Sequence, residues 1–198
     1  MDEVAGAKGV DPLDLRLVLL KDHPRSLKVL QTVAEIANWK QKRPDGRALG
    51  IAYSDALNTY TAAVVEVSVD QQSGQIHVHH MWAAVDPGIA VQPKNVVAQM
   101  EGAMTFGLGA ALIEQINLKN GVPQESNFTE YRVMRMSDVP PIEIKVVSTD
   151  NPPTGIGEAG VPVVAPAIAN AVAQLIGKRL RQLPMLPSRV QAVIKGAA

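Results

Sequence analysis

The chain has 198 residues, of which 46% are hydrophobic, so it is long and apolar enough to fold around a core and is not a disordered chain. Its 19 Lys and Arg residues balance its 19 Asp and Glu residues, which does not favour a nucleic-acid or membrane-surface partner. Cysteine is absent, which excludes disulfides, zinc–thiolate sites and cysteine-held iron–sulfur clusters within this chain. The charge is unevenly spread, because no acidic residue follows Glu158 and the last 40 residues carry +5.

Neither a membrane span nor a secretory signal is expected from the sequence. No apolar run approaches the roughly 18 residues that a spanning helix needs. The first residues, MDEVAGAKGVDPLDLR, lack a basic start followed by an apolar stretch. We therefore expect a soluble protein, cytoplasmic if the natural chain starts at Met1. If Met1 is internal to a longer protein, the compartment is open, and a periplasmic parent protein is compatible with the sequence.

Residues 1–45 are predicted to form a helical N-terminal segment. Asp11 is a good N-cap before Pro12 at the first helical position, and leucines follow at helical spacing. A second helix is predicted from about Pro24 to about Trp39, with apolar residues along one face. The turn PDGR at 44–47 separates this segment from residues 46–198, which we predict to be the main domain. The alternative is that both segments form one compact unit.

The next stretch predicts a β-hairpin. Val65, Val67 and Val69 alternate with polar residues, the turn QQSG follows at 71–74, and QIHVHHMWAAVD reads as the partner strand. The three histidines of that strand raise the question of a metal site, but strand geometry does not put all of them on one face, so a solvated strand is favoured and no metal ligand is predicted.

Beyond the hairpin, a long helix is predicted from about Pro93 to about Gln115, although it contains Gly102, Gly107 and Gly109. Each glycine costs a helix about 0.8–1 kcal/mol relative to alanine, so we expect a close packing partner there. A turn at 119–121, strand-like pieces at 127–135 and 140–149, a helix from about Pro162 to Ile176 capped by Gly177, and a short helix around 187–195 complete the chain. Helices and strands do not alternate regularly, so the predicted class is α+β with short, mostly antiparallel strands.

The stretch PTGIGEAGVPVV matches G-x-G-x-x-G through Gly155, Gly157 and Gly160. In a dinucleotide site this pattern follows a strand directly and is followed, about 20 residues later, by an acidic residue that binds the ribose. Here the prolines of DNPP intervene before the first glycine, and no acidic residue follows the loop. A nucleotide-binding module is therefore the less favoured interpretation.

The alternative is that the loop presents Glu158. Glycines permit backbone angles that other residues avoid, and a carboxylate walled by prolines and aliphatic side chains would be partly desolvated and suited to general-base chemistry. The competing interpretation is an exposed glutamate near a helix N-terminus, which residue chemistry alone favours. Gln99, three residues before Gly102 in QMEG, could donate hydrogen bonds to an oxo or phosphate group, or could be a surface glutamine.

Several segments together resemble the C-terminal part of the molybdenum-binding large subunit of the molybdenum hydroxylases, the xanthine dehydrogenase and aldehyde oxidoreductase family. Within this family the chain is most similar to the isoquinoline 1-oxidoreductase beta-subunit branch. The segments cover nearly the whole chain in order: DPLDLRLVLLKDHPR, VVEVSVD, AVDPGIAVQPKNVVAQMEGAMTFGLGAAL, NFTEYRVMRMSDVPPIEI and GIGEAGVPVVAPAIANAVAQLIGKRLRQLP.

The resemblance implies that Glu158 is the catalytic base, which takes a proton from a hydroxyl on molybdenum during hydroxylation of an N-heterocycle or an aldehyde. It also implies that Gln99 approaches a molybdopterin cofactor, in a dinucleotide form, and that Gly155, Ile156, Gly157, Ala159 and Gly160 line its pocket. The fold implied is that of the family's second molybdenum-cofactor-binding domain. The partners implied are the remainder of the large subunit and a [2Fe-2S] small subunit, with a homodimer as a further possibility.

The chain departs from the family pattern at two places. Ala159 stands where proline commonly follows the catalytic glutamate, and Asp86-Pro87-Gly88 stands where Cys or Ile with Gly is common. Because family large subunits run to several hundred residues, the chain is expected to be a fragment or one piece of a split subunit, inactive alone. The alternative to an enzymatic function is a non-catalytic assembly domain that docks onto a partner subunit.

Overall fold

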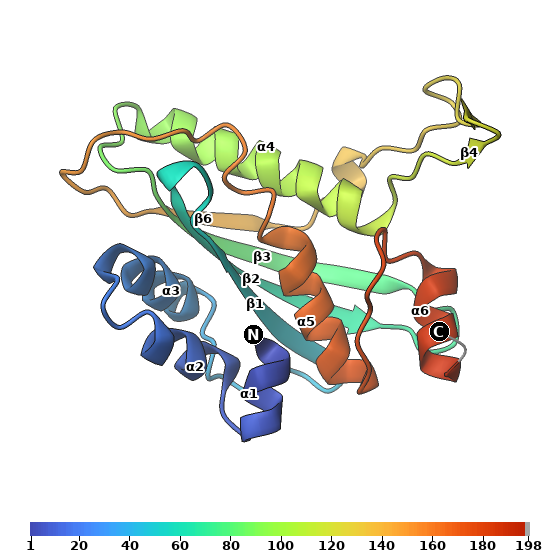
Figure 1. Cartoon of the computed structure of the whole chain (residues 1–198), viewed down its shortest axis with the longest axis horizontal. Coiled ribbons are helices and arrows are strands. Elements are labelled where there is room, and N and C mark those ends of the chain that lie inside the picture. Colours follow the sequence, from blue (N-terminus) through green and yellow to red (C-terminus); the bar gives the residue numbers. More distant parts are fainter. Residues whose placement is uncertain (197–198) are drawn as a thin grey trace.

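The structure of the chain is a computed structural model that describes residues 1–196. It confirms the α+β class, with a sheet placed between helices (Figure 1). The elements, in chain order, are the helices α1 (Asp2–Lys8), α2 (Pro12–Leu19) and α3 (Pro24–Ile36), the strand β1 (Arg47–Ser54), the short helical turn η1 (Ala56–Asn58), the strands β2 (Tyr60–Val69) and β3 (Ile76–Asp86), the helix α4 (Pro93–Leu112), the strands β4 (Leu118–Lys119) and β5 (Val122–Pro123), the turn η2 (Met136–Asp138), the strand β6 (Ile142–Val146), and the helices α5 (Val164–Ile176) and α6 (Pro187–Lys195).

The main sheet has the strand order β1-β2-β3-β6. The first three strands pair antiparallel, as the predicted hairpin requires, and β6 pairs parallel to β3. A parallel neighbour needs a long crossover, which α4 and the segment after it provide. Strand β1, RALGIAYS, was not predicted, because its burial depends on packing against α5, which lies far along the chain.

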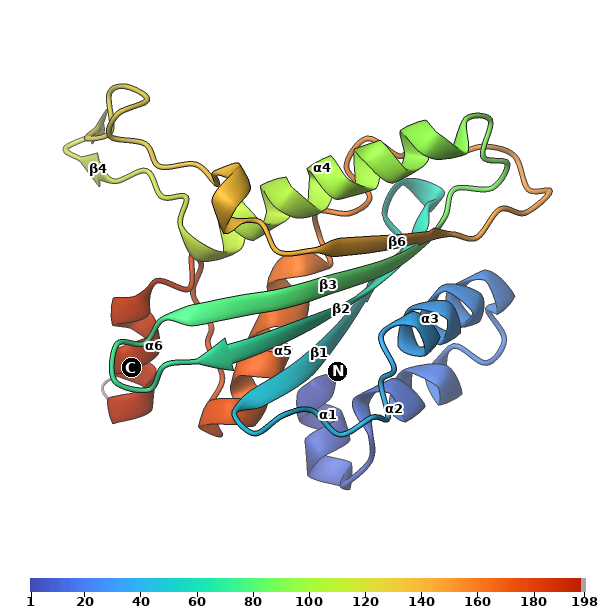
Figure 2. The ribbon, with the colours of Figure 1, turned by 180° about the vertical axis from the view of Figure 1, so that it is seen from behind.

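Helices cover both faces of the sheet. Helix α3 lies on the face seen in Figure 2, and α5 and α4 lie on the opposite face (Figures 1 and 2). Helix α2 packs on α3, and α1 packs on α2. The alternate residues of β2 divide accordingly, because Ala62 and Val64 pack towards α3 while Ala63 and Val65 pack towards α4 and α5. This two-sided burial explains why β2 reads as a nearly continuous apolar run.

The closest approach in the core is between β1 and α5. A Cβ added to Gly50 would lie 1.9 Å from the carbonyl oxygen of Ala167 and 2.5 Å from the backbone nitrogen of Ala171. No side chain fits there, so the glycine lets the helix backbone lie directly on the strand. Gly107 of α4 plays a similar role against the start of α5 and the segment before it, because a Cβ added to it would lie 3.1 Å from both Val164 Cβ and the Val161 carbonyl oxygen. The expected close partner of the glycine-rich helix is thereby confirmed at Gly107, whereas Gly102 faces open space.

The strand-like prediction for 127–135 is wrong, because the side chains of this segment hydrogen-bond to its own backbone. The Thr129 N–H donates to Asn127 Oδ1 at 2.8 Å, and the Ser126 N–H donates to Glu130 Oε2 at 2.7 Å. Side chains of this kind favour turns over strand ladders. Residues 113–140 instead form an arm that extends away from the sheet and carries the β4–β5 hairpin near its tip (Figure 1).

Helix ends differ from the predictions by a few residues. Helix α3 ends at Ile36, before Asn38 adopts a φ of 49°, and α4 ends at Leu112. Gly177 caps α5 with a φ of 69°, as predicted. No helix within residues 1–196 is long and apolar enough to cross a membrane.

A division after residue 45 stays a prediction. Helix α3 shares a hydrophobic cluster with Leu49, Val64 and Trp82 of the sheet. The predicted main domain, 46–198, includes two residues that lie outside the described part of the chain.

The last residue of β3, Asp86, has a buried carboxylate that binds several neighbouring segments. Asp86, which is fully buried, accepts hydrogen bonds from Arg25 Nε at 2.7 Å and Arg25 NH2 at 2.8 Å, and from the Gly88 N–H at 2.8 Å. Thr149, after β6, adds a contact at 3.3 Å. Burial raises the pKa of Asp86, but the Arg25 guanidinium and the Gly88 N–H outweigh it, so the pKa is held below its ordinary value.

We predict that Asp86→Asn lowers the free energy of unfolding by about 2–3 kcal/mol, because it leaves Arg25 without its anionic partner. This value lies at or below the lower end of the range of about 3–5 kcal/mol for fully buried pairs, since the Arg25 side chain remains 22% exposed. Urea denaturation of the chain measures the change. Glu3→Gln is the control, because the Glu3–Arg181 pair is exposed and should leave the midpoint unchanged.

The same pair predicts a pH dependence. A lowered folded-state pKa means that ionised Asp86 stabilises the fold above the ordinary carboxyl pKa, near 3.8, and that this stabilisation is lost as the pH falls through the folded value. The stability difference between the wild-type chain and Asp86→Asn should therefore shrink below about pH 4. A difference that stays constant into the acid range would contradict the assignment.

Candidate functional site

The segment GIGEAG lies in the connection between β6 and α5. Gly155, Gly157 and Glu158 are exposed, whereas Ala159 is only 2% exposed and Gly160 is buried. Ile156 is partly buried and packs against the core on the side of α4 and α5. The segment is therefore anchored at its second half, and its first half forms an exposed loop.

Gly160 seats the loop on α4. A Cβ added to it would lie 3.1 Å from Ala103 Cβ and 3.3 Å from both Met100 Cε and the Met100 carbonyl oxygen. The φ angles of Gly155, Gly157 and Gly160 are not in the left-handed region, so the expectation that these glycines supply unusual backbone angles is wrong. Their contribution is instead close contact at Gly160, whereas a Cβ at Gly155 or Gly157 would meet only ordinary contacts of 3.9 Å, with Leu57 and Gln99 respectively.

The structure brings Gln99 to this loop from a distant part of the chain. Gln99 is exposed near the beginning of α4, and its Nε2 lies 3.9 Å from the position of a Cβ on Gly157. The two motifs singled out in the sequence, QMEG and GIGE, are thus adjacent in space. They border a surface pocket of about 210 Å³, lined by the turn after β3, by the first residues of α4 and by the loop.

Several contacts that the sequence did not predict hold the start of the loop. The Thr154 N–H donates to the Pro87 carbonyl at 2.9 Å, and the Ile89 N–H donates to the Asn151 carbonyl at 2.9 Å. The Thr59 hydroxyl lies 2.6 Å from the Thr154 hydroxyl and 2.5 Å from the Gly155 carbonyl oxygen. Thr59 carries no motif in the sequence, and only the fold places it beside residues almost a hundred positions away.

The expectation that Glu158 is partly desolvated is wrong for this chain, because its side chain is exposed. The carbonyl of Glu158 accepts the Val161 N–H at 3.0 Å, so its backbone is part of the turn that leads to α5. Glu158 precedes the first residue of α5, Val164, by several positions and is not itself in the first turn of that helix. The loop thus fixes the backbone of Glu158 and leaves its carboxylate facing outward.

The loop and Gln99 offer neutral hydrogen-bond donors to a ligand. Within residues 1–196, no internal hydrogen bond engages the N–H groups of Gly155, Ile156, Gly157 and Glu158, nor the Gln99 carboxamide. Such donors suit oxygen-rich acceptors such as oxo ligands and pterin or phosphate oxygens. Without side chains at Gly155 and Gly157, a ligand can approach the backbone closely.

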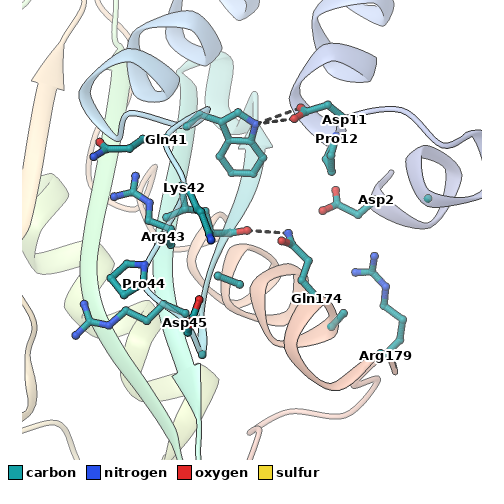
Figure 3. Close-up of a pocket in the computed structure, with 18 of the residues that line it drawn as sticks. Asp2, Asp11, Pro12, Gln41, Lys42, Arg43, Pro44, Asp45, Gln174 and Arg179 are labelled. Atoms are coloured by element: carbon teal, nitrogen blue, oxygen red, sulfur yellow. Dashed lines mark hydrogen bonds between the residues drawn. The ribbon is translucent and has the colours of Figure 1, made fainter.

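A larger pocket, of about 760 Å³, lies elsewhere and contains none of the residues predicted for the site. It is formed by α1, the loop after α3 and the end of α5 (Figure 3). Two of its acidic groups have partners within the protein, because Asp2 pairs with Arg16 and Asp11 accepts the Trp39 indole N–H. Gln174 is likewise engaged with the Leu49 carbonyl at 2.8 Å. The first two contacts join parts of the N-terminal segment to one another, and the third joins α5 to β1.

The histidines of β3 do not form a metal site. His79 Nε2 lies 2.8 Å from Ser68 Oγ, and the His80 ring stacks on Trp82 with centroids 4.1 Å apart. Burial lowers the pKa of both imidazoles, which favours their neutral forms. No group of three or more His, Asp or Glu side chains in the described part of the chain is arranged to hold a metal ion.

Residues 5–140 match the family described as the molybdopterin cofactor-binding domain. The chain is 42% identical over 194 residues to isoquinoline 1-oxidoreductase subunit beta from Brevundimonas diminuta, covering 96% of this chain and 25% of that protein. It is 32% identical over 209 residues to the membrane-bound aldehyde dehydrogenase [pyrroloquinoline-quinone] from Gluconacetobacter polyoxogenes, covering 96% of this chain and 27% of that protein. The chain thus spans about a quarter of the length of these curated relatives.

Solved structures have the same fold. The aldehyde oxidoreductase from Desulfovibrio desulfuricans superposes with a TM-score of 0.61 and 28% identity over 68% of this chain and 15% of that chain. Quinoline 2-oxidoreductase from Pseudomonas putida 86 superposes with a TM-score of 0.65 over 69% of this chain and 19% of that chain.

The glycine contacts predict unequal effects of alanine within the loop. Gly160→Ala should lower the free energy of unfolding by about 1–2 kcal/mol, because the added methyl group crowds Ala103 and Met100. Gly157→Ala, which meets only the Gln99 side chain, should change it by less than about 0.5 kcal/mol. Urea denaturation of both variants measures the difference. Equal effects would mean that Gly160 is not the anchored residue.

Proposed function

The chain belongs to the molybdopterin cofactor-binding domain family, and we propose that it is the C-terminal cofactor-binding portion of a molybdenum hydroxylase that oxidises an N-heterocycle or an aldehyde. The observation that carries the proposal is the adjacency of Gln99 and the exposed Gly155–Glu158 loop. The names of the relatives support the two substrate classes, since one is an isoquinoline oxidoreductase and others are aldehyde oxidoreductases or dehydrogenases.

The loop amides and the Gln99 carboxamide would hold a molybdenum cofactor, in a dinucleotide form. These donors are exposed and uncharged, which suits the oxygen-rich periphery of such a group. When bound, the cofactor supplies the oxygen-transfer and redox chemistry that amino-acid side chains lack. The residues that line the site are Gly155, Ile156, Gly157, Ala159 and Gly160, together with Gln99.

Glu158 acts as the general base at this site. An ionised carboxylate is an acceptor without a proton of its own, so it can take a proton from a group that becomes nucleophilic. The anchored backbone at Ala159 and Gly160 fixes where the side chain begins. Further parts of the large subunit would cover this face, exclude water and bind the substrate.

The partners proposed are the remainder of the large subunit and a [2Fe-2S] subunit that takes the electrons away. This chain contains no cysteine with which to bind such a cluster itself. The relative from Brevundimonas diminuta is named as a subunit of an oxidoreductase, which supports an assembly of several chains.

A second candidate is a non-catalytic domain that docks onto a partner subunit. The arm between α4 and β6 favours it, because Phe128 is 95% exposed and Met136 is 89% exposed. Recovery of a cofactor-binding or iron–sulfur partner in an inactive complex would support this candidate. A nucleotide-binding module has less support, because β6 ends at Val146 and no strand leads directly into Gly155.

In the complete enzyme, Glu158→Gln should reduce turnover by about 10²–10⁴-fold, the range that loss of a general base produces. Bound molybdenum should remain at the wild-type level, because the amide keeps the size of the side chain. Steady-state kinetics and metal analysis measure the two quantities. Glu143→Gln, on the exposed side of β6, is the matched control and should leave turnover intact. Retained turnover in Glu158→Gln would refute the assigned base.

The chain alone is expected to hold no stoichiometric molybdenum. The pocket beside the loop, at about 210 Å³, is smaller than the roughly 300–1,000 Å³ typical of ligand sites, and the loop face is exposed. Metal analysis of the purified chain, and of the complete enzyme as the positive control, tests this expectation. Stoichiometric molybdenum in the chain alone would contradict it, and pyrroloquinoline quinone without molybdenum in the complete enzyme would contradict the proposed cofactor.

A further inference from the structure

We propose that Thr59 is a positioning residue for the loop that carries Glu158, an inference that rests on the proposed role of Glu158. Thr59 lies between η1 and β2, and it is 1% exposed. Its hydroxyl lies 2.6 Å from Thr154 Oγ1 and 2.5 Å from the Gly155 carbonyl oxygen. It therefore touches the loop at its first glycine, which is also the first of the loop residues proposed to line the cofactor site.

The directions of these hydrogen bonds follow from the number of protons. A threonine hydroxyl has one proton, and a carbonyl oxygen can only accept. Thr59 therefore donates to Gly155. The single proton of the Thr154 hydroxyl has two acceptors in reach, Thr59 Oγ1 at 2.6 Å and the Pro87 carbonyl oxygen at 3.1 Å, and we assign it to the shorter contact with Thr59. The Thr154 N–H remains free to donate to the Pro87 carbonyl, which it does at 2.9 Å. A buried chain of hydrogen bonds thus runs from the β3 turn through Thr154 and Thr59 to Gly155.

Together with Gly160, this chain fixes the loop from both sides. The Thr59 bond holds Gly155, and the close contacts of Gly160 with Ala103 and Met100 hold the far end. Glu158 lies between these two points, so the space in which its carboxylate moves is set by both. Loss of the Thr59 hydroxyl would leave the Gly155 carbonyl without its partner, while the Thr154 hydroxyl would keep only its contact with the Pro87 carbonyl at 3.1 Å, so the loop would relax at Gly155.

Thr61, which lies on β2 two residues after Thr59, provides a matched control. It is fully buried, and its hydroxyl has no hydrogen-bond partner within residues 1–196. Thr→Val is nearly isosteric at both positions, so the two variants differ mainly in whether a hydrogen bond to the loop is lost. Thr59→Ser retains the hydroxyl and tests whether the bond, rather than the shape, is needed.

The first measurement is amide hydrogen exchange in the complete enzyme. In Thr59→Val the Thr154 and Ile89 amides should exchange about tenfold faster. Their hydrogen bonds join the turn after β3 to the start of the loop, which the Thr59 hydroxyl holds in place. In Thr61→Val and Thr59→Ser they should exchange at the wild-type rate. Unchanged exchange in Thr59→Val would overturn the proposal.

The second measurement is turnover in the same preparations. Thr59→Val should lower kcat about tenfold or more at an unchanged molybdenum content, since small displacements of a catalytic group are costly. Thr59→Ser should recover most of the activity. Faster exchange with an unchanged kcat would overturn the positioning role. If Glu158→Gln is inactive in that case, the proposed function stands and only the inference about Thr59 fails.

Discussion

The carboxylate of Asp86 joins three parts of the chain that the candidate site needs. It binds Arg25 at the beginning of α3, the Gly88 N–H in the turn after β3, and Thr149 after β6. A buried charge is tolerated only when its partners are in place, so these elements must meet if the protein is to fold. The turn after β3 then presents the Pro87 carbonyl to Thr154, and the position of the loop follows from that contact.

Close backbone contacts are the second constraint, and glycine permits each of them. Gly50 lets α5 lie on β1, and Gly107 lets the segment before α5 lie on α4. Gly88, with a φ of 76°, also leaves room for Pro152, whose carbonyl oxygen would lie 2.3 Å from an added Cβ. The turn after β3, the loop and the helix that follows it are therefore brought together at places where no side chain intervenes.

Local patterns in the sequence predicted the regular elements well, because each pattern reports a local physical preference. Proline and Asp11 mark the beginning of α2, Gly177 marks the end of α5, and the valines of β2 mark a buried strand. The segment 127–135 was misread, since aromatic and β-branched residues there suggested a strand while Asn127 and Glu130 bind the local backbone. Strand β1 was missed because its burial depends on α5, which lies more than a hundred residues later.

The residues of the candidate site also fall into two groups, those that the sequence predicts and those that only the fold identifies. Gln99 and the Gly155–Gly160 loop were identified from motifs and a family resemblance, and the fold brings them together. Thr59 and Pro87 could not be found from the sequence, because a lone threonine and a proline in a turn carry no pattern. Their role arises from contacts between segments that only the folded chain places side by side.

The exposure of Glu158 separates two properties that a catalytic carboxylate needs. One is placement, which this chain supplies through the Thr59 bond on one side and the seated Gly160 on the other. The other is a dry, low-dielectric surrounding, in which fixed dipoles and charges act more strongly than in water. An exposed side chain lacks the second property, and the chain spans only about a quarter of the length of its relatives. If Glu158 has the proposed role of a base, the cover that it needs has to come from parts of the protein outside this chain.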